Sequence, residues 1–314
     1  MMNAALAGRG RVPSGSTDGG RTGRRPALSS QDEKSWMSAP PPGAEADGAE
    51  WALPQIDTTV AHSARRYDYW LGGKDNFAAD RESGDAIAAA FPSVRIAVIE
   101  NRRFVRRATD FLARHAGIQQ FLDIGTGIPT SPNVHEIAQV IAPASRVVYV
   151  DNDPIVLAHA RALLASSAEG ATAYIDADVR HPDQITGNVE LREIFDFSRP
   201  VALMLAAILH FIPDEDDPYE LVARLVGALP KGSYLVMSHA TNDFLTPDEV
   251  AEISAGRWGP FFARSEAEFA QFFDGFELVP PGITSVAEWR AEAEPKPRPT
   301  AAEAYTYCAV ARVS

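Results

Sequence analysis

The carboxyl-terminal two thirds of the chain alternate short apolar runs with segments of helical periodicity. Apolar runs of strand length lie at 120–125, 146–151, 172–178, 200–209 and 233–240. Segments with apolar residues at helical spacing lie at 134–142, 154–165 and 217–229. Strands that alternate with helices form parallel βαβ units, so this order predicts an α/β fold with a doubly wound, mostly parallel sheet. Residues 276–286 and 304–313 add two strands without a clear helix between them, which predicts an antiparallel end to the sheet.

The residues before this alternation are of two kinds. Residues 1–50 are rich in Gly, Pro and Ser and are predicted to be a disordered tail. Helical periodicity begins after Thr58 or Thr59, stops at the Gly72–Gly73 pair, restarts at Asp75 or Asn76, and returns from 92 to 115. The sequence therefore predicts three parts, namely the tail 1–50, a helical cap 51–116 and a sheet domain 117–314.

Acidic residues end three successive predicted strands. Asp123 is followed by Gly125 and Gly127, and the next two strands end at Asp151 and Asp178. Open α/β sheets bind ligands at this carboxyl edge. There Asp151 can accept the hydroxyls of a ribose, Asp178 can accept from the exocyclic amine of adenine, and the glycines allow a ligand close to the backbone. Solvated aspartates at strand ends are the alternative interpretation.

The loop after the first strand argues against a phosphate-bearing nucleotide. The dinucleotide fingerprint requires a third glycine, where this chain has Thr130, and no P-loop pattern occurs. An adenosine cofactor without phosphate fits better, and S-adenosylmethionine is the common one. A nicotinamide-dependent oxidoreductase on the same kind of sheet is the weaker alternative, and a sensor that binds the cofactor without transferring methyl is another.

Several segments resemble a known family. They are ARRYDYWLGGKDNFAADRE (64–82), NRRFVRRATDFLA (101–113), QFLDIGTGIPT (120–130), VVYVDNDPIVLAHARALL (147–164) and PVALMLAAILHFIPD (200–214). They are similar to the actinobacterial S-adenosylmethionine-dependent methyltransferases that were long described as a domain of unknown function. The resemblance implies a Rossmann-like class I methyltransferase fold over 117–314, with seven strands, the last antiparallel, and extra N-terminal helices. By the same resemblance Asp123, Gly125 and Gly127 form the cofactor loop, Asp151 and Asn152 the ribose and adenine side, and Asp178 and Val179 the adenine edge.

The block that follows the first predicted helix has two interpretations. Tyr67, Gly72, Gly73 and Asn76 would either fold over the cofactor as a lid that excludes water, or simply end a helix packed with aromatic side chains. We expect the lid and count these four among the cofactor-binding residues.

Two histidines are the candidates for the acceptor side. His210 and His239 end the fourth and fifth predicted strands, where an imidazole can take a proton from a hydroxyl or amine. A structural histidine is the equal alternative, and no metal site is expected because the spacing matches no compact ligand set. Arg65, Arg66 and Arg81 are expected at the surface or paired with carboxylates. The aromatic residues Phe244, Trp258, Phe261 and Phe262 indicate an apolar acceptor, although core packing is the commoner use.

Composition indicates the binding partners and the cellular compartment to expect. The net charge of −13 argues against non-specific nucleic-acid binding. The longest apolar run is shorter than a membrane span, and the N-terminal residues lack the apolar stretch of a secretory signal. The single cysteine, Cys308, has no intrachain partner, which fits a reducing compartment. We therefore expect a cytoplasmic enzyme that methylates a small molecule, and the sequence leaves the oligomeric state open.

Overall fold

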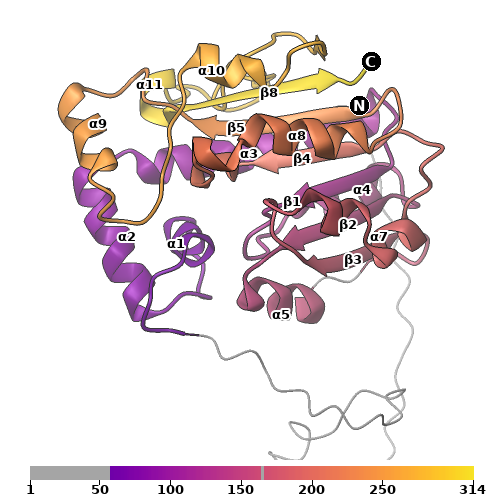
Figure 1. Cartoon of the computed structure of the whole chain (residues 1–314), viewed down its shortest axis with the longest axis horizontal. Helices are drawn as coiled ribbons and strands as arrows, with labels where there is room; N and C mark the ends of the chain where they lie inside the picture. Colours follow the sequence, from indigo (N-terminus) through magenta and orange to yellow (C-terminus); the bar gives the residue numbers. More distant parts are fainter. Residues whose placement is uncertain (1–56, 164–165) are drawn as a thin grey trace, which may run out of the picture. The chain divides into compact units, whose positions relative to one another are not determined.

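The computed structural model describes residues 57–163 and 166–314 (Figure 1). The tail 1–50, predicted to be disordered, lies outside the described residues. Within the described part, no helix combines the length and the apolarity needed to cross a membrane.

One mixed sheet organises the fold, with strand order β3-β2-β1-β4-β5-β8-β6 and β7 paired to β8. The strands are β1 (Gln120–Ile124), β2 (Arg146–Asp151), β3 (Ala171–Asp176), β4 (Ala202–Ala206), β5 (Tyr234–Ala240), β6 (Glu277–Leu278), β7 (Thr284–Ser285) and β8 (Thr306–Arg312). The first five pair in parallel, and β8 runs antiparallel to β5, β6 and β7. The predicted α/β class and the antiparallel end are confirmed.

The sheet has one more strand than predicted. The run 276–286 was expected to form one strand, but it forms two strands of two residues each, β6 and β7. Pro280 and Pro281 lie between them, and proline has no N–H to donate to a ladder. The interruption therefore follows from the two prolines.

Helices precede, connect and follow the strands. They are α1 (Ser63–Trp70), α2 (Ala78–Ala90), α3 (Val94–Arg114), α4 (Val134–Ile141), α5 (Pro154–Leu163), α6 (Pro182–Thr186), α7 (Val189–Ile194), α8 (Pro218–Gly227), α9 (Pro247–Ser254), α10 (Glu266–Gln271) and α11 (Ala301–Ala304), with 3₁₀ turns η2 (Leu209–Phe211) and η3 (Asp214–Asp216). The three N-terminal helices are confirmed, but α1 begins later than predicted. His62 caps it, because the N–H and hydroxyl of Thr59 donate to Asp57 Oδ1 in a local turn instead.

The sheet is buried on both faces because its strands alternate two apolar sets. Phe121, Val147 and Met204 pack in the cluster that contains the buried residues of α3 and α4. Their neighbours Leu122 and Val148 pack on the opposite face, in the cluster that contains α7, α8 and α10 residues. The single cysteine, Cys308, is fully buried in β8, on the α3 face.

The sheet has a topological switch point between β1 and β4. From β1 the chain passes to β2 and β3 on one side, then returns to β4 and β5 on the other. The connections at the carboxyl ends of β1 and β4 therefore leave in opposite directions, which opens a crevice there.

Candidate functional site

A cavity of about 450 Å³ lies at this crevice. The ends of β1, β2 and β4, the turn after β3, α1, and the loop 258–260 line it. Of the predicted site residues, it brings together Tyr67, Asp123, Gly125, Gly127, Asp151, Asn152, Asp178, Val179 and His210. Gly72, Gly73, Asn76 and His239 are not among the residues that line it. Nine of the thirteen predicted residues therefore lie in the wall of one cavity.

The two glycines after β1 have backbone conformations that favour glycine. Gly125 has φ +72° and Gly127 has φ +65°. A Cβ on Gly125 would overlap Ile208 Cδ1, so this glycine lets the chain after β4 approach the end of β1. A Cβ on Gly127 would meet no atom within 4 Å, because Gly127 borders the open space of the cavity.

Asp151 links the loops that follow β1 and β2. Its Oδ2 accepts from the backbone N of Gly127 at 2.8 Å, and its Oδ1 accepts from the backbone N of Asp153 at 3.0 Å. Burial raises the pKa of Asp151, and these two hydrogen bonds oppose the rise. A carboxylate has about four lone-pair sites, so Asp151 retains acceptor capacity at the cavity.

The carboxylate of Asp178, predicted to accept from adenine, already accepts several hydrogen bonds from the protein. Its carboxylate accepts from the backbone N of Arg180 at 2.9 Å, from Arg180 Nε at 3.0 Å and from Asn152 Nδ2 at 3.0 Å. The hydrogen bonds from Arg180 lower the pKa of Asp178 to about 2. Among the described residues, the backbone N–H of Val179 has no acceptor, so this adenine-side wall offers a donor beside a partly satisfied carboxylate.

Asp123 faces a cation that sequence reasoning did not single out. Burial raises the pKa of Asp123 to about 6, although the charge of Arg102 and a hydrogen bond from Thr126 oppose the rise. Arg102 lines the cavity from α3, and its Nη2 donates to the carbonyl of Thr130 at 2.5 Å. The sequence signal for Arg102 was its place in the segment 101–113, one of the segments that carry the family resemblance.

The predicted lid block lies apart from the cavity, except for Tyr67. Asn76 Nδ2 donates to Asp68 Oδ2 at 2.8 Å and to the carbonyl of Gly73 at 3.1 Å. A Cβ on Gly73 would overlap the Asp68 carboxylate, and Gly72 has φ +81° directly after α1. These contacts favour the helix-end interpretation for Gly72, Gly73 and Asn76.

His210 lines the cavity, but not from the end of a strand. β4 stops at Ala206, Ala207 has a positive φ of 57°, and His210 belongs to η2. Its Nδ1 accepts from the backbone N of Ala240 at 3.4 Å. Burial, reinforced by the nearby His239 and Arg264, holds the pKa of His210 well below its usual value. The imidazole is therefore neutral near neutral pH.

His239 ends β5 as predicted, but both of its ring nitrogens are occupied. Nδ1 is 2.7 Å from the carbonyl of Ala240, to which it donates, and Nε2 is 2.9 Å from Arg264 Nη1, from which it accepts. Arg264 in turn donates to the carbonyls of Leu209 and Ile212, which flank His210. Burial lowers the pKa of His239 to about 4. The prediction of His239 as a base therefore loses its geometric basis, and its contacts are those of a residue that holds the η2 turn.

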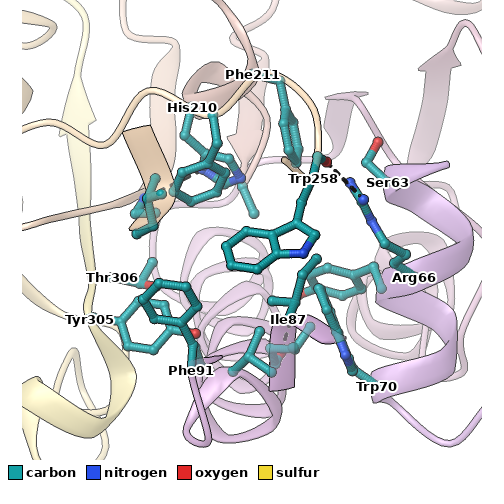
Figure 2. A pocket seen from close by; sticks show the side chains of 18 of the residues that line it. Ser63, Arg66, Trp70, Ile87, Phe91, His210, Phe211, Trp258, Tyr305 and Thr306 are labelled. Atoms are coloured by element: carbon teal, nitrogen blue, oxygen red, sulfur yellow. Dashed lines mark hydrogen bonds between the residues drawn. The ribbon is translucent and has the colours of Figure 1, made fainter. Parts of the chain in front are cut away.

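A second cavity, of about 150 Å³, adjoins the first (Figure 2). The residues common to both are Ser63, Arg66, Tyr67, Asn101, Ala207, His210, Phe211 and 258–260. The wall of this second space is mostly apolar and carries several aromatic side chains, and we call the space the aromatic cavity; its aromatic lining includes Trp70, Phe91, Phe211, Trp258, Phe261 and Tyr305.

The aromatic cavity corrects two further predictions. Arg66 is half-buried and forms no salt bridge with a carboxylate among the described residues; its Nη1 donates to the carbonyl of Trp258 at 2.9 Å and to Ser83 Oγ at 3.1 Å. Of the four aromatic residues singled out in the sequence, only Trp258 and Phe261 line this cavity. Phe244 packs against the core beside Tyr307, and Phe262 is exposed.

Comparisons with known proteins agree on one family. A family model described as S-adenosyl methyltransferase matches residues 49–314. A crystal structure of a DUF574 family protein from Streptomyces avermitilis MA-4680 is 51% identical, with a TM-score of 0.77, and the match covers 82% of this chain and 99% of that one. A proposed methyltransferase from Thermobifida fusca YX is 40% identical, with a TM-score of 0.76, over 85% of this chain and 100% of that one. A search of curated proteins found no significant match.

Proposed function

Because the chain belongs to the S-adenosyl methyltransferase family, we propose that it methylates a small molecule held in the aromatic cavity, beside a cofactor held at the switch point. The enzyme is an S-adenosylmethionine-dependent methyltransferase with a class I fold.

The chemistry of the larger cavity fits S-adenosylmethionine. Its volume of about 450 Å³ is within the range of roughly 300–1,000 Å³ typical of ligand sites. Three carboxylates line it, those of Asp123, Asp151 and Asp178, which suits a ligand with two positively charged groups. The observation that carries the proposal is Asp151, a buried carboxylate anchored to Gly127 at the carboxyl edge, where α/β folds hold a ribose.

Each end of the ligand has a partner of matching chemistry in the cavity wall. We assign the ribose hydroxyls to Asp151, and the adenine edge to the free N–H of Val179 together with Asp178 and Asn152. The amino-acid end of the cofactor is a zwitterion. Asp123 and Arg102, of opposite charge and both in the cavity wall, match its ammonium and carboxylate groups.

Bound S-adenosylmethionine supplies an electrophilic methyl group on a sulfonium, so the protein needs chiefly to orient the acceptor and exclude water. Holding two reactants in a near-attack arrangement contributes up to about 7–11 kcal/mol in well-oriented cases. Arg66 of α1 is hydrogen bonded to the carbonyl of Trp258 and thereby joins α1 to the loop at the junction of the two cavities. This contact supports a role in closing the site over the methyl group.

Isothermal titration calorimetry with S-adenosylhomocysteine tests the assignment of Asp151. Asp151→Asn should weaken binding by about 10- to 150-fold, because hydrogen bonds to a charged group contribute about 1.5–3 kcal/mol. Asp176→Asn is the matched control, since Asp176 pairs with Asp151 in the β2–β3 register but is exposed and outside the cavity wall. Equal affinities for both variants and the unmodified enzyme would remove Asp151 from the site.

A second measurement separates catalysis from sensing. Isotope-labelled S-adenosylmethionine is incubated with the enzyme and a small-molecule extract, and label is sought in the extract by mass spectrometry. Transfer to a small molecule supports the proposal. Tight binding without any transfer would favour a sensor, and binding of NADH in place of S-adenosylhomocysteine would favour an oxidoreductase.

A further inference from the structure

We propose that the acceptor is a single aromatic ring bearing an oxyanion, a phenolate or an aryl carboxylate, and that Arg66 and His210 hold this oxygen at the junction of the two cavities. The inference rests on the proposed function, because it names the substrate class of that site. Shape, charge and hydrogen-bond direction support it separately.

The aromatic cavity has the size of one ring. Its volume of about 150 Å³ equals that of an engineered apolar cavity that binds benzene, about 150 Å³. Phe91 and Trp258 meet edge to face in its wall, with ring centroids 5.8 Å apart, and Trp70 and Tyr305 are further rings of the same lining (Figure 2). Trp70 Nε1 donates to the carbonyl of Gly84, so its polar group is already satisfied. Such a wall packs against a flat apolar ring.

The charge of the aromatic cavity is positive. None of the described residues that line it carries a carboxylate, and Arg66 is its one permanently charged side chain. Arg66 forms no salt bridge within the described part of the chain, and only its Nη1 is hydrogen bonded. Burial lowers the pKa of Arg66, and the charge of Asp80 opposes this change. A half-buried guanidinium without a carboxylate partner favours an anion and disfavours an ammonium group.

The hydrogen-bond direction at the junction agrees with this charge. Because His210 Nδ1 accepts from the backbone N of Ala240, the proton of the neutral ring lies on Nε2. No described residue is hydrogen bonded to Nε2, so this N–H can donate to a ligand. Arg66 also only donates. Both groups therefore match an oxygen with free lone pairs, and neither can remove a proton from it.

The acceptor is therefore converted to its reactive oxyanion without a base from the protein. Arg66 favours the ionised form of a bound phenol, whose proton is released to solvent. A lone pair of the oxygen then forms the new O–CH₃ bond while the C–S bond of the donor breaks. The electron pair of that bond stays on sulfur, and the sulfonium becomes the neutral thioether of S-adenosylhomocysteine.

Binding to the complex of enzyme and S-adenosylhomocysteine tests the substrate class without turnover. The probes are 4-nitrophenol and benzoate as single-ring oxyanions, 2-naphthol as a two-ring phenol, cyclohexanol as a non-aromatic alcohol, and benzylamine as a cation. We expect 4-nitrophenol or benzoate to bind at least 10-fold more tightly than the other three. Binding of benzylamine as the tightest probe, or of none of them while S-adenosylhomocysteine binds, would overturn this inference and leave the proposed function standing. Failure of S-adenosylhomocysteine itself to bind would overturn the proposed function.

The role of Arg66 has a spectroscopic signature. The absorbance of 4-nitrophenolate reports the ionisation of the bound ring, and its apparent pKa should fall by about 1–3 units in the complex. Arg66→Met should abolish that fall, whereas Arg95→Met, at an exposed site on α3, should retain it. A fall that persists in Arg66→Met would refute the role of Arg66.

A change in cavity size completes the test. Phe91→Ala removes a ring from the wall of the aromatic cavity only, and should improve the binding of 2-naphthol relative to 4-nitrophenol by at least 10-fold. An unchanged ratio in a variant that still binds S-adenosylhomocysteine would place the ring elsewhere.

Discussion

Replacement of Gly125 by alanine tests how the structure makes room for the site. Alanine at this position must adopt a φ near +72°, and left-handed backbone costs an L-residue about 1–2 kcal/mol. The added Cβ would also overlap Ile208 Cδ1 and lie 3.0 Å from Ile208 Cβ. Overpacking of this kind costs about 1–3 kcal/mol, so Gly125→Ala should lower the free energy of unfolding by about 2–5 kcal/mol.

A matched variant separates the two contributions. Gly117 has φ +70°, but a Cβ there would meet no atom within 4 Å. Gly117→Ala should therefore lower the free energy of unfolding by the backbone cost alone, about 1–2 kcal/mol. In an Ile208→Ala background, the cost of Gly125→Ala should fall to the same value, which gives a coupling of about 1–3 kcal/mol between positions 125 and 208.

Urea unfolding followed by far-ultraviolet circular dichroism measures all of these quantities, provided the slope with denaturant is unchanged among the variants. The reasoning is refuted if Gly125→Ala and Gly117→Ala cost the same within about 0.5 kcal/mol, or if the cost of Gly125→Ala is independent of residue 208. Either result would mean that the end of β1 and the chain after β4 are not in close contact.

Two further predictions concern pH. In the unfolded chain the pKa of His239 is about 6.5, whereas burial lowers it to about 4 in the folded protein. Between these two values the unfolded chain binds the extra proton. Acidification from about pH 7 to 5 should therefore lower the free energy of unfolding by about 2 kcal/mol through this residue. His239→Gln should flatten that part of the urea–pH profile, and an unaltered profile would contradict the burial argument. If ionised Asp123 binds the ammonium group of S-adenosylhomocysteine, calorimetric affinity should fall about tenfold per pH unit below its pKa of about 6. Asp123→Asn should bind weakly with no such dependence, and a flat profile for the unmodified enzyme would contradict this role.

The strands whose ends line the larger cavity were predictable because their signals are local. Short apolar runs with an Asp at or near the end predicted β1 and β2 to within one residue. The run 200–209 was equally apolar, yet β4 ends at Ala206 because Ala207 turns with a left-handed backbone and leads into η2. An apolar run indicates burial but not strand geometry. Because η2 is also buried, the sequence pattern alone does not show where β4 ends.

The contacts of Arg66 and His239 were not predictable because they join segments that are distant in sequence. The hydrogen bond from Arg66 to the carbonyl of Trp258 joins residues 192 positions apart. His239 has the residue type and strand-end position of a base, but its partner Arg264 lies on a later loop. In both cases the function of a polar side chain depends on what a remote segment places against it.

The burial of Cys308 gives this protein an intrinsic reporter. It is the single cysteine of the chain, fully buried in β8, where burial raises the pKa of its thiol well above the usual value. Alkylating reagents attack the thiolate, so they modify it only when β8 separates from its neighbours. A molecule that binds only the folded chain slows that opening by the factor 1 + [L]/Kd. The rate of alkylation therefore measures how much of the folded chain holds such a molecule, with no chromophore or turnover required.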